Sequence, residues 1–104
     1  MIGLLTGTIA ISGRNPIVID VHGVGYAVSV PARLISRLAK ETKQTLFVHT
    51  HVADDALDLY GFSTEEELFL FKLLLTVSGI GPRTALAIVD HGVSEIRRAV
   101  TTSD

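Results

Sequence analysis

The sequence of 104 residues contains no cysteine. Disulfide bonds, thiolate metal sites and cysteine nucleophiles are therefore excluded, and the absence suits the reducing cytoplasm. No stretch approaches the ~18–20 consecutive apolar residues of a membrane-spanning helix. The densest apolar run, from Leu68 to Leu75, is interrupted by Lys72. Because the amino terminus has neither a basic segment nor a long apolar run, we expect no signal peptide there.

The sequence patterns of common enzymes are missing as well. The chain has no G-x-x-x-x-G-K-[ST] loop for ATP, and no serine, histidine and acid stand together in a nucleophile motif. We therefore expect a protein that has no catalytic residues and no cofactor, and that does not hydrolyse ATP by itself.

Positive charge is also scarce in this chain. Nine lysines and arginines face eleven aspartates and glutamates, for a net charge of −2. This balance counts against a nucleic-acid partner, since phosphate-binding proteins usually carry a basic excess. Local placement decides binding, however, because one face can be basic while another is acidic. Acidic residues cluster at positions 54–58 and 65–67, whereas the segment from Arg83 onward carries three arginines and no lysine.

What the chain does contain is enough apolar material for a core, with 47% hydrophobic residues. Its first ~60 residues alternate between apolar and polar with the two-residue period of β-strands. We expect strands over 2–11, 17–22, 24–30, 45–52 and 57–62, with Leu46, Val48 and Val52 on one face of the fourth. A short amphipathic helix is predicted over 32–40. Five strands with a helix between the third and fourth fit an OB barrel, and other small β-barrels fit nearly as well.

Helices are predicted from Ser63 onward, so we divide the chain into an OB domain over 1–62 and a helical domain over 63–104. Ser63-Thr64-Glu65-Glu66 is typical of a capping box in which Ser63 accepts the amide of Glu66. The helix predicted over 64–77 is apolar on more than one side, which favours burial on several sides. A second helix is expected to begin at Pro82 and to stop at Gly92, and a last short one to begin at Ser94.

The turn between the first two of these helices carries the strongest functional signal. The segment from Val77 to Ala85, VSGIGPRTA, has the form of a helix-hairpin-helix. Glycines allow the tight turn, and the start of the next helix presents free amides that bind anions such as DNA phosphates. The candidate DNA-binding residues are Gly79, Ile80, Gly81, Arg83 and Thr84. Contacts to phosphate do not depend on the base sequence. The alternative to a DNA-binding turn is an αα-hairpin whose glycine turn binds no ligand.

Two further clusters lie in the β-rich half. Asp54 and Asp55 fall between two predicted strands, where adjacent acids are ordinary turn formers. His49 and His51 share a strand face near Asp54 and could contribute to a metal site. No third ligand lies at a characteristic spacing, so we predict no metal.

Four segments, taken together and in this order, resemble the RuvA family. They are Met1-Ile2-Gly3, Val24-Gly25-Tyr26, Leu59-Tyr60-Gly61-Phe62 and Val77-Ser78-Gly79-Ile80-Gly81-Pro82. The resemblance implies an OB-fold domain followed by helix-hairpin-helix units. It further implies a homotetramer, single or paired face to face as an octamer, that recognises four-way (Holliday) DNA junctions in recombination and repair. The implied partners are the RuvB ATPase, which drives branch migration, and the RuvC nuclease, in the bacterial cytoplasm.

The resemblance also assigns roles to individual residues. Asp54 and Asp55 match an acidic pin at the centre of the tetramer, which repels phosphates and helps to separate strands. Gly79, Ile80, Gly81 and Arg83 match the first hairpin that grips the duplex backbone.

The chain departs from the family pattern in two ways. Leu4, Thr6 and Ala53 stand where relatives usually have basic residues, so we expect a changed affinity or salt dependence. Relatives also continue past the position of Asp104, through a second hairpin and a domain that binds RuvB. We expect both to be absent here, so that this chain does not contact RuvB through that domain.

Two other functions stay open at this point. A generic OB-fold binder of single strands would need exposed aromatic side chains for stacking, whereas Tyr26, Phe47, Tyr60 and Phe62 all fit a core. A pure oligomerisation module would use the glycine turn only as a turn.

Overall fold

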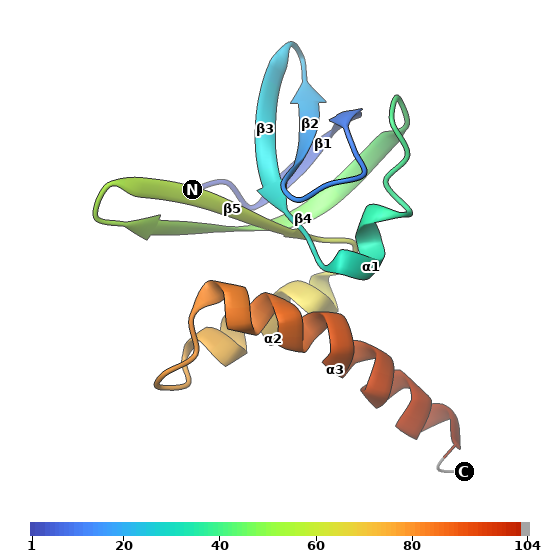
Figure 1. Ribbon diagram of the computed structural model, residues 1–104, viewed down its shortest axis with the longest axis vertical. Helices are drawn as coiled ribbons and strands as arrows, with labels where there is room; N and C mark the ends of the chain where they lie inside the picture. Colours follow the sequence, from blue (N-terminus) through green and yellow to red (C-terminus); the bar gives the residue numbers. More distant parts are fainter. Residues whose placement is uncertain (103–104) are drawn as a thin grey trace.

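The computed structural model describes the backbone of residues 1–102 and the side chains through Gly92. It consists of a β-barrel followed by two packed helices (Figure 1). The strands are β1 (Leu4–Ile11), β2 (Ile17–Val21), β3 (Val24–Ser29), β4 (Lys43–Ala53) and β5 (Ala56–Phe62). The helices are α1 (Ala32–Ile35), α2 (Glu65–Leu75) and α3 (Pro82–Thr102).

The five strands close into a barrel in the order β1-β2-β3-β5-β4. All neighbours are antiparallel except β3 and β5, which pair in parallel through Val28 with Leu59 and Ser29 with Tyr60. β1 closes the barrel by pairing with both β2 and β4. Because α1 lies between β3 and β4, the predicted OB-fold is confirmed.

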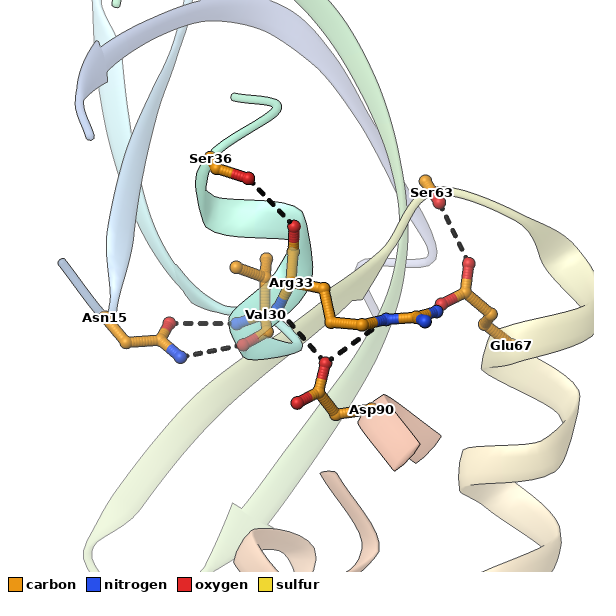
Figure 2. Close-up of polar contacts among 7 residues, drawn as sticks. All are labelled: Asn15, Val30, Arg33, Ser36, Ser63, Glu67 and Asp90. Atoms are coloured by element: carbon orange, nitrogen blue, oxygen red, sulfur yellow. Dashed lines mark hydrogen bonds and ion pairs between the residues drawn. The ribbon is translucent and has the colours of Figure 1, made fainter. Parts of the chain in front are cut away.

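Alternation along the strands builds the barrel core. The inward residues are almost all aliphatic and less than a tenth exposed: Leu5, Ile9, Ile17, Ile19, Val28, Val30, Leu46, Val48 and Leu59. Leu34 and Leu38, from α1 and the turn after it, cover the same core. The Asn15 side chain ties the β1–β2 loop to this end of the barrel, since it accepts from the amide of Val30 and donates to its carbonyl (Figure 2).

The β4–β5 hairpin extends past the barrel wall. Val52 follows Leu46 and Val48 on one face of the predicted strand, but Leu46 and Val48 are buried whereas Val52 and its partner Leu57 are each 62% exposed. The buried row ends instead at Thr50, whose hydroxyl accepts the amide of Ile2 and donates to its carbonyl. Beyond Thr50 the two strands still pair but have no opposite wall (Figure 1).

A second, smaller core joins the barrel to the helices. It contains Tyr60 and Phe62 from β5, Phe71 from α2, and Ala85 and Val89 from α3. The ring of Phe71 lies 5.2 Å from that of Tyr60 and 5.0 Å from that of Phe62. This aromatic contact holds the helices below the barrel.

The structure corrects the predicted length of α1 and the predicted N-cap of α2. α1 is only one turn long, because the amides of Arg37 and Leu38 donate to carbonyls three residues back and Glu41 adopts a φ of 70°. The N-cap of α2 is Thr64 rather than Ser63: Thr64 has the extended backbone of a cap, and its hydroxyl accepts the amide of Glu67 at 3.2 Å.

The surface of α2 is also less buried than its apolar sequence predicts. Phe69 is 69% and Leu73 52% exposed. The barrel and α3 cover other sides of this helix and leave these two side chains uncovered.

The predicted stop at Gly92 and restart at Ser94 are wrong, because α3 is continuous from Pro82 to Thr102. A glycine inside a helix costs only ~1 kcal/mol relative to alanine. Gly92 also lacks the positive φ of a C-terminal glycine cap. The side chains of the segment that we predicted as a last helix lie outside the described residues. Within residues 1–102, no helix combines the length and the apolar character needed to cross a bilayer.

Candidate nucleic-acid interface

The predicted helix-hairpin-helix turn is present between α2 and α3. Thr76 is the C-cap of α2, and its hydroxyl donates to the carbonyl of Leu73. The chain then turns through Gly79, which has a φ of 88°, a value that disfavours side chains with a Cβ. The amide of Ile80 donates to the carbonyl of Val77 at 3.1 Å and closes the turn.

The start of α3 presents unpaired amides to solvent. The amide of Ala85 donates to the carbonyl of Gly81 at 2.9 Å, which makes Gly81 the residue that caps the helix. Pro82 has no amide, and the amides of Arg83 and Thr84 have no carbonyl one turn earlier in the helix. These amides and the positive end of the helix dipole can together bind an anion.

The five predicted DNA-binding residues lie together at this turn. Gly79, Gly81, Arg83 and Thr84 are exposed, while Ile80 is half-buried against the second core. Ile80 therefore anchors the turn to the protein, and its neighbours remain accessible to a ligand. The structure thus contains an exposed helix terminus with an arginine beside it.

A cleft of about 440 Å³ lies next to Arg83, between α3 and the barrel. Its lining residues are Asn15, Pro16, Ser29, Asp58, Tyr60, Arg83 and Leu86. Burial raises the pKa of the Tyr60 phenol, the negative charge of Asp58 raises it further, and Arg83 lowers it in part. The phenol is therefore uncharged at neutral pH, where it can donate a hydrogen bond.

The sequence did not identify the barrel residues that line this cleft. Asn15 lies in the β1–β2 loop and Asp58 in β5. Only the closed barrel brings these two residues beside Arg83. Tyr60 was identified as part of a family-like motif and as a core residue. Its ring is indeed buried, but its place beside Arg83 follows from tertiary packing.

Asp54 and Asp55 form the tip of the β4–β5 hairpin. The last paired residues are Ala53 and Ala56, so the two aspartates are the whole loop, and both are exposed. The hairpin tip and the α2–α3 turn project toward the same side of the molecule, the left side of Figure 1. A ligand on that side could meet both the anion-binding turn and the acidic tip.

His49 lies at the contact between β4 and α2, and His51 lies near it on β4. Their rings are 6.3 Å apart, and the ring of His49 lies 5.5 Å from that of Phe71. Burial lowers the pKa of His49, and the positive charges of Lys72 and His51 lower it further. Among the residues that the structure describes, no three potential ligands come close enough to hold a metal ion.

Of the neutral residues at expected basic positions, Leu4 and Ala53 are exposed. Thr6 is exposed as well, and its hydroxyl lies 3.0 Å from that of Thr45 on the neighbouring strand. None of the three adds positive charge to the surface.

A sequence model of the RuvA N-terminal domain matches residues 1–61, more than half of the chain. The chain belongs to the RuvA family. A second model, of the SAM-like helix-hairpin-helix tandem, matches residues 71–103 and so includes the turn described above.

Several relatives carry the name Holliday junction branch migration complex subunit RuvA. The protein of Trichlorobacter lovleyi is 47% identical over 91 residues, which cover 88% of this chain and 46% of that protein. The protein of Herpetosiphon aurantiacus is 41% identical over 107 residues, which cover 100% of this chain and 54% of that protein. The protein of Halothermothrix orenii is 48% identical over 89 residues, 86% and 45% of the two chains. The chain spans about half the length of the curated relatives it matches.

Proposed function

We propose that this chain binds four-way DNA junctions without sequence preference and shapes them for branch migration in recombination and DNA repair. The observation that carries the proposal is the exposed α2–α3 turn, with its unpaired amides and Arg83, in a member of the RuvA family. The printed name of the relatives, a subunit of a branch migration complex, agrees with it.

The turn binds one phosphate of the DNA backbone. The amides of Arg83 and Thr84 donate to phosphate oxygens, and the guanidinium of Arg83 adds a charge-assisted contact. Gly79 and Gly81 let the DNA backbone approach the protein backbone closely. Because every nucleotide has the same phosphate, these contacts select no base sequence.

Selectivity for a junction comes from symmetry. A homotetramer, single or paired as an octamer, places four copies of the turn so that each meets one DNA arm. Asp54 and Asp55 then act as an acidic pin that repels phosphates near the crossover and keeps the strands apart. The residues divide into a barrel domain over 1–62 and a helical domain over 63–104.

The proposed role is not enzymatic. The protein holds the junction, and a partner ATPase of the RuvB type supplies the work, with a RuvC-type nuclease acting on the same junctions. We place the protein in the bacterial cytoplasm, because its named relatives are bacterial. A single-strand binder that stacks bases on aromatic rings of the barrel is disfavoured, since Tyr60 and Phe62 are buried and Tyr26 and Phe47 half-buried.

The proposal is tested by a gel-shift titration at fixed salt that compares a synthetic four-way junction with a linear duplex of the same arm sequence. We expect tighter binding to the junction. Arg83→Ala should weaken binding to both DNAs and reduce the salt dependence by about one counterion per contacted phosphate.

Lys40→Ala is the matched control, because it removes one exposed positive charge from the loop after α1. It should bind like the unmodified protein. Equal binding to junction and duplex would contradict junction recognition, and binding to neither would favour an oligomerisation module.

A further inference from the structure

One pair of residues, Arg33 and Asp90, connects α1 of the barrel with α3 of the helical hairpin through polar contacts. The Asp90 carboxylate on α3 accepts the backbone amide of Arg33 at 3.1 Å, and the same oxygen lies 3.5 Å from Nε of the Arg33 side chain (Figure 2). Asp90 is 17% exposed at its side chain. Within the described side chains, through Gly92, this is the only ion pair.

Asp90 supplies the capping side chain that α1 lacks at its N-terminus. The N-cap of α1 is Pro31, which has no side-chain oxygen to accept a helix amide, and the first turn of α1 has no acidic residue. Arg33 is the second residue of the helix, where an N-cap side chain would normally bind the free amide. Asp90 therefore caps α1 from α3, a helix far from α1 in the sequence.

Arg33 also lines a cavity beside the other helix of the hairpin. It lines a narrow cavity of about 30 Å³ together with Arg37 and Glu67, the latter a buried residue of α2. The hydroxyls of Ser63 and Thr64 donate to the Glu67 carboxylate at 2.9 and 3.0 Å, and so fix its position. Arg33 therefore pairs with a carboxylate from α3 and lines the same cavity as a carboxylate from α2.

Both ends of the Arg33–Asp90 contact are rigidly held. The barrel fixes Arg33, because its neighbour Leu34 is buried in the core and Asn15 clamps Val30 just before the helix. The second core fixes the segment around Asp90, because the adjacent Val89 is fully buried. The contact therefore relates the position of the barrel directly to that of α3.

The same contact lies on the helix whose first residues follow the α2–α3 turn. Asp90 stands seven residues after Arg83, a separation of about 10 Å along a helix. The apolar core holds α3 near Ala85 and Val89, and apolar packing alone permits a helix to rock. A second, charge-assisted contact on the flank of α3 restricts that rotation.

We propose that Arg33 and Asp90 are positioning residues that set the angle between the helical hairpin and the barrel, and that this angle determines selectivity for branched over linear DNA. The inference rests on the proposed function. Binding of one hairpin to a linear duplex needs only the local geometry of residues 79–84. Simultaneous binding to several arms also needs every hairpin at the correct angle to the barrel and its acidic tip.

The test uses three variants of the full chain. Asp90→Ala removes both the cap and the ion pair, whereas Asp90→Asn keeps an oxygen that can accept the Arg33 amide. Glu66→Gln, at an exposed position in the first turn of α2, is the control for the loss of one negative charge. Affinity for the junction and for the matched linear duplex is measured for each variant at fixed salt.

We expect Asp90→Ala to lower the preference for the junction by about three- to tenfold, the range that the typical net contribution of one hydrogen bond can supply. Its affinity for the linear duplex should stay unchanged. Asp90→Asn should keep most of the preference, and Glu66→Gln should keep all of it. An equal loss of affinity for both DNAs in Asp90→Ala would overturn the proposed role in selectivity.

A distance measurement without DNA tests the positioning role on its own. The native chain has no cysteine, so spin labels can be attached only at introduced cysteines. Val24→Cys marks the barrel and His91→Cys marks α3, both at exposed positions, with labelled chains diluted in excess unlabelled protein. We expect a single narrow distance that becomes broad in Asp90→Ala and stays narrow in Asp90→Asn.

The two measurements separate the possible failures. An unchanged narrow distance in Asp90→Ala would overturn the positioning role, whatever the DNA binding shows. If the unmodified protein showed no junction preference, the proposed function would fail, and the distance distributions would still decide the positioning role. If Asp90→Ala did not fold, Arg33→Ala, which keeps the backbone amide but loses the guanidinium, would replace it in both measurements.

Discussion

At the residue scale, the two glycines of the α2–α3 turn meet different requirements. Gly79 has a φ of 88°, a conformation that costs a residue with a Cβ roughly 1–2 kcal/mol. Gly81 has no positive φ, and a Cβ at this position would meet no atom within 4 Å. The fold therefore favours glycine at 79, whereas a methyl group at 81 would obstruct only an approaching ligand.

This difference leads to a prediction for a pair of alanine variants. Gly79→Ala should lower the free energy of unfolding by about 1–2 kcal/mol. Gly81→Ala should change it by less than ~1 kcal/mol, the size of a cap effect, and should still weaken binding to linear duplex. Urea denaturation and fluorescence anisotropy check the two quantities. If Gly81→Ala bound duplex like the unmodified protein, the DNA backbone would not approach at this turn.

The residues of the turn could be found from sequence because their signal is local. Two glycines, a proline and an arginine at fixed spacing describe a turn and a helix start within one short segment. Asp90 and Arg33 gave no such signal. Their roles depend on a contact between residues far apart in the chain, and neither residue type predicts it.

At the element scale, β4 and α2 meet around His49. The ring of His49 packs against Phe71, and burial is the main reason that its pKa is lowered, followed by the charges of Lys72 and His51. The folded protein therefore favours the neutral imidazole. In the unfolded chain His49 has its ordinary pKa of about 6.5. As the pH falls below that value, the unfolded chain binds a proton at His49 that the folded protein binds less readily, and folding becomes less favourable.

We predict that this contact makes the protein less stable in mild acid. The contribution of neutral His49 is present above pH ~6.5 and is lost as the pH falls from there toward the lowered pKa of the folded state. His49→Gln should therefore reduce the decline in the urea midpoint between about pH 7.5 and 5.5. His91→Gln, at an exposed position on α3, is the control. A decline of equal size in His49→Gln would rule out this source of the pH dependence.

The elements themselves were predicted with uneven success, for physical reasons. Strand alternation gave all five strands, because each has one face in the barrel core. Helix boundaries were less certain, because neighbouring residues compete for the same role. Ser63 and Thr64 can both cap α2, and the backbone geometry selects Thr64. Gly92 can stop a helix or continue one, and α3 continues.

At the scale of the whole molecule, the relative placement of the β4–β5 hairpin tip and the α2–α3 turn bears most directly on DNA binding. The acidic tip of the β4–β5 hairpin and the α2–α3 turn extend toward the same side (Figure 1). In the proposed function the turn binds phosphate and the acidic tip repels it, so DNA held at the turn would have its path restricted near the tip. This relation could not be predicted from spacing, since it depends on how the barrel packs against the helices through Phe62 and Phe71.

The acidic tip gives the last prediction. Asp54 and Asp55 are exposed at a two-residue loop, so the double variant Asp54→Asn, Asp55→Asn should leave thermal stability unchanged. Each charge near a phosphate costs on the order of 1 kcal/mol at 4 Å in water. Their removal should therefore tighten junction binding and reduce the separation of strands at the crossover. The separation is followed by the fluorescence of 2-aminopurine placed at the crossover bases.

The double variant Glu65→Gln, Glu66→Gln is the matched control, because it removes two exposed charges from the first turn of α2 rather than from the hairpin tip. If repulsion at the tip opens the crossover, only the tip variant lowers the 2-aminopurine signal, and it does so while binding the junction more tightly. A loss of signal in both variants would point to net charge instead of position. An unchanged signal and unchanged junction geometry in the tip variant would mean that Asp54 and Asp55 are an ordinary turn, and that strand separation depends on the geometry that the hairpins impose on the arms.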